Sequence, residues 1–188
     1  MTSKSTPPVK LTYADFVRFP DDGRRHELID GDRYVTPSPT VRHQTISGRL
    51  HQAVGNFLEQ HPLGQIWAAP LDVVLSDGNI VEPDLVYVSR ERAAVLTAQN
   101  IQGAPDLVIE ILSPGTRMTD EIVKRDAYER FGVAEYWVVN PESRAVMVCR
   151  RRDREFENVA ELTAKSGDAL MTPLLPGLRI ELEHLFRD

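Results

Sequence analysis

The sequence has almost no cysteine and no long apolar run, and both absences narrow the class of protein. Cys149 is the single cysteine among 188 residues, which excludes an internal disulfide and a zinc site built on cysteines. No apolar stretch approaches the roughly 18 to 20 residues that a membrane helix needs. The first residues also lack the apolar core of a secretory signal. We therefore expect a cytoplasmic protein with no membrane partner.

The chain also lacks an excess of positive charge. It carries 22 lysines and arginines against 28 acids, a formal net charge of −6, which argues against a protein that coats nucleic acid with its whole surface. A local basic groove remains compatible with this charge. Arg117 and Arg125, close to Lys124 on a predicted helix, are the candidates for contacts with nucleic acid. No helix-turn-helix, zinc finger or dense basic arm is evident.

The composition is that of one soluble globular domain. Hydrophobic residues make up 41% of the chain and charged residues 27%, which are ordinary values for such a domain. We place the domain at residues 11–188 and expect residues 1–10, with Pro7 and Pro8, to form a flexible lead-in.

Hydrophobic periodicity predicts the order of the elements. A hairpin is expected around the Asp30-Gly31 pair, and a helix is expected to run to about Glu59. The segments GQIWAAPLDVVL and IVEPDLVYVS are expected to form an antiparallel hairpin, and DLVIEILSP a third strand. A second helix with Ile122 on its apolar stripe and the strand EYWVVN follow. The order from the first long helix onward is therefore αβββαβ.

Two carboxylates lie inside the most apolar of these strands. Asp84 belongs to IVEPDLVYVS and Glu110 to DLVIEILSP. Strands as apolar as these are typically covered on both faces, so an acid within them is paired, bound to a metal or costly. Mg²⁺ prefers hard oxygen ligands and usually takes one or two carboxylates. We therefore predict that Asp84 and Glu110 are catalytic and bind Mg²⁺, for which Mn²⁺ can substitute.

A lysine is the third group that metal-dependent cleavage of a phosphodiester needs, because its charge stabilises the attacked phosphate. In the PD-(D/E)XK nuclease core, which the αβββαβ order resembles, the lysine stands two residues after the acid. Here that position is Leu112, so the lysine has to come from elsewhere. Lys124, with Tyr128 four residues later on the same helical face, is our candidate. The alternative is that Lys124 is one charge on an exposed face. For His43, at the start of the first long helix, a hydrogen bond at the helix end is the expected role.

Beyond these patterns, the sequence resembles a known family. The strings HELIDGDRYVTPSPTVRHQ, LDVVLSDGNIVEPDLVYVSRER, GAPDLVIEILSPGTR and KRDAYERFGVAEYWVVNPE are similar to those of the Uma-two family of restriction endonuclease type. The resemblance covers roughly residues 11 to 185 and implies the PD-(D/E)XK nuclease fold. That fold is an α/β (α+β) fold with a restriction-endonuclease-like αβββαβ core, here a mixed sheet flanked by helices with an extra N-terminal hairpin and C-terminal strands.

The resemblance also implies roles for individual residues. A divalent-metal site is implied at Asp84 and Glu110, with a lysine that has migrated to the helix at Lys124. Tyr128 is similar to the tyrosine of a helical pair found in the RecB-like branch of this fold. Glu27 matches an acidic position near the site and is a possible supporting residue, while a glutamate on the hairpin surface is the alternative.

Three functions remain open from the sequence. The first is a Mg²⁺-dependent DNA endonuclease of restriction type, acting as a homodimer so that two sites address two strands. The second is a nuclease-fold module that is catalytically weak or inactive and binds nucleic acid or a protein partner; Leu112 in the lysine position and the acidic total charge favour it. The third is a hydrolase of a small phosphodiester, which a deep enclosed pocket would favour.

Overall fold

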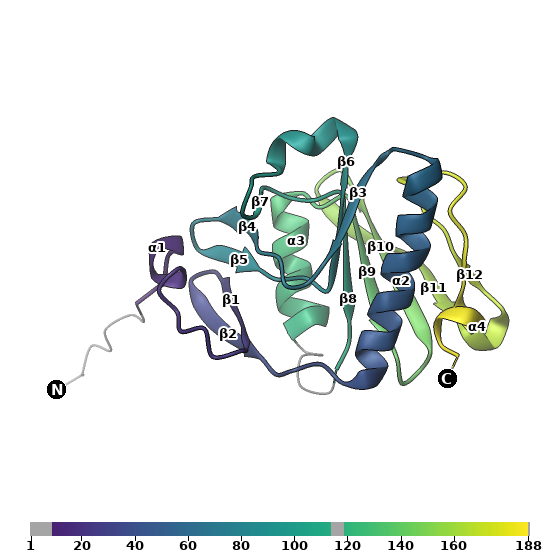
Figure 1. Cartoon of the computed structure of the whole chain (residues 1–188), viewed down its shortest axis with the longest axis horizontal. Helices are drawn as coiled ribbons and strands as arrows, with labels where there is room; N and C mark the ends of the chain where they lie inside the picture. The colour runs from purple at the N-terminus through teal and green to yellow at the C-terminus, as the bar shows by residue number, and fades with distance from the viewer. Residues whose placement is uncertain (1–8, 114–118, 188) are drawn as a thin grey trace.

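A computed structural model describes residues 9–113 and 119–187. Its centre is a six-stranded mixed sheet (Figure 1). The strand order is β11-β10-β9-β8-β6-β3. The β8 and β9 strands run parallel, and the other neighbours run antiparallel. The strands are β3 (Gly64–Ala68), β6 (Leu85–Ser89), β8 (Leu107–Ile111), β9 (Glu135–Asn140), β10 (Ala145–Arg152) and β11 (Glu155–Thr163).

The long helix α2 (Val41–Gln60) covers one face of this sheet (Figure 1). Thr40 caps its start by accepting a hydrogen bond from the backbone of His43. Ile46, Leu50 and Val54 are buried against strand residues of the same face, because their spacing places them on one side of the helix. The C-terminal segment completes this layer with η3 (Ala164–Ser166), β12 (Ala169–Leu170), β13 (Ile180–Glu181) and α4 (Leu182–Leu185).

The opposite face is covered by α3 (Arg125–Phe131) and by a second sheet of order β2-β1-β5-β4-β7. Val86 and Val108 face this side, whereas their neighbours Leu85 and Leu107 face α2, as strand alternation requires. The strands β6, β8 and β9 are therefore buried on both faces, whereas the edge strand β11 is largely exposed. The remaining elements are α1 (Tyr13–Phe16), β1 (Arg25–Ile29), β2 (Asp32–Thr36), β4 (Val73–Ser76), β5 (Asn79–Val81), η1 (Arg90–Val95), β7 (Ile101–Gln102) and the π-helix η2 (Thr119–Lys124).

The expected hairpin between GQIWAAPLDVVL and IVEPDLVYVS is divided between the two sheets. Its outer part, β3 with β6, belongs to the central sheet, and its inner part, β4 with β5, belongs to the second sheet. Pro70 and Pro83 lie where the chain leaves one sheet for the other. Proline donates no hydrogen bond to a ladder, so continuous pairing ends at both points. The prediction of a single hairpin was therefore wrong in this respect.

The predicted fold is otherwise confirmed. The α2, β3, β6, β8, α3 and β9 elements follow one another in the αβββαβ order, and β1 with β2 forms the extra N-terminal hairpin. Ile122 was expected on an apolar stripe but is 56% exposed. The expected lead-in lies largely outside the described residues. Within the described ranges, no helix combines the length and apolar character needed to cross a membrane.

The close pairing of β3 with β6 makes Gly64 a sensitive position. A Cβ atom there would lie 2.3 Å from the Val88 carbonyl oxygen, which is backbone and cannot move aside. We expect Gly64→Ala to lower the free energy of unfolding by about 1–3 kcal/mol in urea denaturation.

Gly48→Ala on α2 is the matched control, because nothing lies within 4 Å of its added Cβ. Alanine in an open helical position should raise stability by about 0.5–1 kcal/mol. Equal effects of the two substitutions would contradict the close approach of β3 to β6.

Candidate active site

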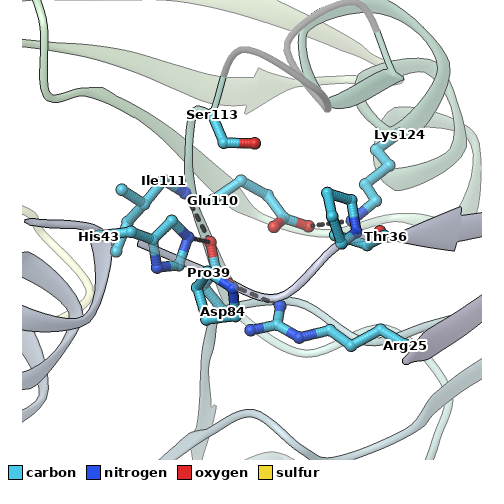
Figure 2. A pocket seen from close by; sticks show the side chains of 10 residues that line it. Arg25, Thr36, Pro39, His43, Asp84, Glu110, Ile111, Ser113 and Lys124 are labelled. Atoms are coloured by element: carbon cyan, nitrogen blue, oxygen red, sulfur yellow. Dashed lines mark hydrogen bonds and ion pairs between the residues drawn. The ribbon is translucent and has the colours of Figure 1, made fainter. Parts of the chain in front are cut away.

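The pairing of β6 with β8 brings the two predicted acids together. Leu85 lies opposite Ile109 in this antiparallel pair, so the next position along the register places Asp84 opposite Glu110. Both acids are buried, with 4% and 2% of their surface exposed. They line one pocket of about 20 Å³, which has room for about one water molecule (Figure 2).

Glu110 receives two hydrogen bonds from the helical segment that follows it. Lys124 Nζ donates to Glu110 Oε1 over 3.1 Å, and Tyr128 Oη donates to the same oxygen over 2.7 Å. Lys124 is buried, so the alternative of a charge on an exposed helical face does not hold. Burial, together with the charge of Glu110, raises the pKa of Tyr128 well above its ordinary value. Tyr128 therefore stays protonated and remains a donor.

Glu27 also lies in this site, not on the surface of the hairpin. Its Oε1 is 2.9 Å from Lys124 Nζ and accepts a hydrogen bond of 2.8 Å from the backbone N–H of Glu82. Only 1% of the residue is exposed. The ammonium of Lys124 is thus shared between Glu27 on β1 and Glu110 on β8.

Asp84 is held by donors from three directions. Its Oδ2 accepts from His43 Nε2 at 3.0 Å and from the Ile111 backbone N–H at 2.8 Å, while Oδ1 accepts from Arg25 Nη1 at 2.7 Å (Figure 2). Burial opposes ionisation, but the interactions with His43 and then Arg25 outweigh it and lower the pKa of Asp84. Asp84 is therefore an ionised and fully paired acid.

The ring of His43 has a different role from the expected one. Its backbone N–H makes the helix-end hydrogen bond with Thr40 Oγ1, but the ring is directed at Asp84. An ionised carboxylate only accepts, so Nε2 carries the proton of this bond. Nδ1 is buried and has no hydrogen-bond partner among the described residues. The helix-end hydrogen bond expected for His43 is therefore present, but it does not account for the ring, which contacts Asp84.

Arg25 joins Asp84 to another acid, Glu82. Its Nε lies 3.1 Å from Glu82 Oε1. Burial, with added repulsion from the charges of Glu27 and Asp72, raises the pKa of Glu82 to about 7 although Arg25 opposes the shift. For Arg25, burial acts against the charge, but the attraction of Asp84 and Glu82 raises its pKa.

The sequence reasoning did not place Arg25, His43 or Glu82 at the site, although Arg25 and His43 carry a periodic signal. Arg25 precedes Glu27 by two residues, which places both side chains on one face of β1. His43 precedes Ile46 by three residues and so shares the buried side of α2.

The other predicted residues lie away from the two acids or outside the described part. Arg125 donates to the Phe156 carbonyl oxygen at 3.1 Å and lies over the Phe156 ring, so it packs α3 against β11. Arg117 falls in the range 114–118, outside the described residues.

The carboxylate oxygens at the pocket are ligands that suit a hard cation. Asp84 and Glu110 offer carboxylate oxygens from neighbouring strands, and Mg²⁺ commonly takes one or two carboxylates and keeps waters in its other positions. Across residues 9–113 and 119–187, no three side chains of histidine, cysteine or acid are gathered as a complete protein cage. The chemistry of the pair fits Mg²⁺ or Mn²⁺ and does not fit a structural zinc site.

The pairing of Asp84 predicts a pH-dependent contribution to stability. The pKa of Asp84 is lowered in the folded protein. Its contribution to stability is therefore fully present when the pH is above the pKa of the unfolded chain, near 3.9, and is lost as the pH falls through the pKa of the folded protein. Asp84→Asn should reduce the free energy of unfolding by about 1–3 kcal/mol at pH 7 and by much less at pH 3. Urea denaturation at the two pH values measures both differences, and an equal deficit at each would mean that Asp84 is not ionised when folded.

Comparison with solved structures supports the fold. A crystal structure from Anabaena variabilis, described as "a putative nuclease belonging to DUF820", matches with a TM-score of 0.75 and 20% sequence identity. The match covers 95% of this chain and 98% of that one. At this identity the likeness shows a shared nuclease-like fold. No curated protein matches the chain.

Comparison with family profiles identifies the family. The profile of Uma2, described as "Putative restriction endonuclease", matches residues 13–183, which is nearly the whole chain and agrees with the resemblance noted from the sequence. The chain therefore belongs to the Uma2 family.

Proposed function

We propose that the protein is a Mg²⁺-dependent DNA endonuclease of restriction type, which hydrolyses phosphodiester bonds in the cytoplasm as a homodimer. The observation that carries the proposal is the convergence of Asp84, Glu110 and Lys124 in one pocket. DNA as the substrate is supported by the description of the Uma2 family. The 20 Å³ of the pocket gives no support to a small phosphodiester held in a deep enclosed site.

Asp84 and Glu110 would hold the cation, and Mn²⁺ could replace Mg²⁺. When bound, this ion would stabilise negative charge on the attacked phosphate and lower the pKa of a bound water. Lys124 would stabilise the same developing charge, since its ammonium already lies beside Glu110. Tyr128 and Glu27 fix the positions of Glu110 and Lys124, while His43 and the Ile111 N–H orient Asp84.

A nuclease-fold module that binds DNA or a protein without efficient cleavage is the alternative. Two observations favour it: Leu112 occupies the place of the usual lysine, and both acids take part in ion pairs with Arg25 and Lys124. Turnover therefore separates the two functions, whereas DNA binding does not.

Cleavage of high-molecular-weight genomic DNA tests the proposal, because such DNA contains every short recognition sequence. We expect cleavage with Mg²⁺ or Mn²⁺, none with EDTA, and a loss of at least about 10³-fold in Asp84→Asn and Glu110→Gln. Glu157→Gln, an exposed acid on β11, is the matched control and should cleave normally. Equal inactivity of all four proteins, with DNA or protein binding retained, would favour the binding module.

Lys124→Met tests the migrated lysine. Methionine keeps much of the buried volume but removes the charge, so turnover should fall by about 10²-fold or more while Mn²⁺ binding persists. The metal-free variant should also unfold more easily, because Glu27 and Glu110 lose the charge that they share. An unchanged cleavage rate in a folded variant would rule out Lys124 as a catalytic residue.

A further inference from the structure

Arg25 covers the oxygen of Asp84 that a cation would need. Oδ2 is already held by two N–H donors, His43 Nε2 and the Ile111 backbone, and these fix the orientation of the carboxylate. The remaining oxygen, Oδ1, is 2.7 Å from Arg25 Nη1. A divalent ion on Oδ1 and this guanidinium would compete for the same oxygen, because both are cations that need close contact with it.

Arg25 has a second anchor that would keep it near the pocket after it leaves Asp84. Its Nε lies within ion-pair distance of Glu82 Oε1, at 3.1 Å and without hydrogen-bond geometry, and its side chain keeps 20% of its surface exposed. The planar guanidinium presents several donors at once, so it can hold one carboxylate while another edge turns to a new acceptor. Arg25 can therefore release Asp84 while it keeps its ion pair with Glu82.

Arg25 borders both the small pocket and a much larger hollow. Arg25 lines the pocket of about 20 Å³ and also an adjacent hollow of about 410 Å³. The larger hollow is lined by hydrogen-bond donors of Arg24, Thr36, Ser38 and Gln44 and by two acids, Asp21 and Glu82. Thr36, Pro37 and Pro39 also line both spaces, so the two are adjacent and a guanidinium that leaves Asp84 can turn toward the larger one. The donors along this hollow, Arg25 among them, suit the phosphates of a nucleic acid strand.

We propose that Arg25 is a substrate-binding residue that is released by the cation: it pairs with Asp84 in the metal-free protein and binds a DNA phosphate once a divalent ion occupies Asp84. The inference rests on the proposed nuclease function. Arg25 stabilises the ionised form of Asp84 before the ion arrives. After release it turns toward the larger groove, still anchored by Glu82, and takes the phosphate as its new acceptor.

The test measures the Mn²⁺ affinity and kcat/KM of Arg25 variants. Substitution of an arginine with only a structural role would not change these two quantities in opposite directions. Arg25→Gln should bind Mn²⁺ about tenfold more tightly in electron paramagnetic resonance titrations without DNA, because the competing charge is gone. Its kcat/KM for genomic DNA at saturating Mn²⁺ should fall at least about tenfold, because a phosphate ligand is lost. Arg152→Gln, the same change at an exposed position on β10, should match the native protein in both measurements.

Thermal unfolding shows whether Arg25→Gln is folded. If it is not, Arg25→Lys serves as the second test variant. Lysine keeps a cation beside Asp84 but cannot hold Glu82 and a phosphate together through a planar fork. Its Mn²⁺ affinity should stay within about threefold of the native value, and its kcat/KM should still fall about tenfold. Native cleavage by Arg25→Lys would overturn the phosphate role.

The outcomes separate this inference from the proposed function. If the native protein cleaves DNA but a folded Arg25→Gln binds Mn²⁺ no more tightly, the release of Arg25 is overturned and the nuclease stands. If no protein cleaves DNA but Arg25→Gln binds Mn²⁺ more tightly, the competition at Asp84 is supported and the nuclease fails. Absence of Mn²⁺ binding from the native protein and all Arg25 variants would overturn both.

Discussion

The buried ammonium of Lys124 is the interaction on which the arrangement of the site depends. It lies 2.9 Å from Glu27 on β1 and 3.1 Å from Glu110 on β8, and so it ties the second sheet to the central sheet through the start of α3. A buried charge without partners is costly, and two buried carboxylates without a shared cation repel each other. The helix and both sheets must therefore meet at this point, which gives the pocket its fixed geometry.

Asp84 provides the complementary junction, between α2, β1 and β8. Its carboxylate is oriented by donors from His43 and Ile111 on one oxygen, and it faces Arg25 on the other. Fixed dipoles of this kind lower the reorganisation that a reaction needs, because the groups are already in place before the substrate arrives. Under the proposed release of Arg25, the oxygen that faces this side chain is the one that exchanges its guanidinium for the metal ion.

A buried acid in an apolar strand does not by itself mark an active site, as Glu135 on β9 shows. Glu135 is as buried as Glu110, but it accepts from Trp137 Nε1 and from Thr172 Oγ1, and it pairs with Arg150. These partners satisfy its charge within the fold and away from the pocket of Asp84. Glu110 differs from Glu135 in having a second carboxylate beside it, because the register of β6 with β8 places Asp84 opposite Glu110.

The sequence by itself determined the order of the elements and identified two acids, Asp84 and Glu110, and the lysine that joins them in the pocket, Lys124. These depend on local properties: hydrophobic periodicity, proline positions and the strings shared with the Uma2 family. Only the tertiary structure decided which distant residues complete the site. Arg25 and His43 are 59 and 41 positions from Asp84 along the chain, and the division of one expected hairpin between two sheets brings β1 and Glu27 to Lys124. Periodicity tells which face of an element a side chain occupies, but the packing of elements remote in sequence decides what that face meets.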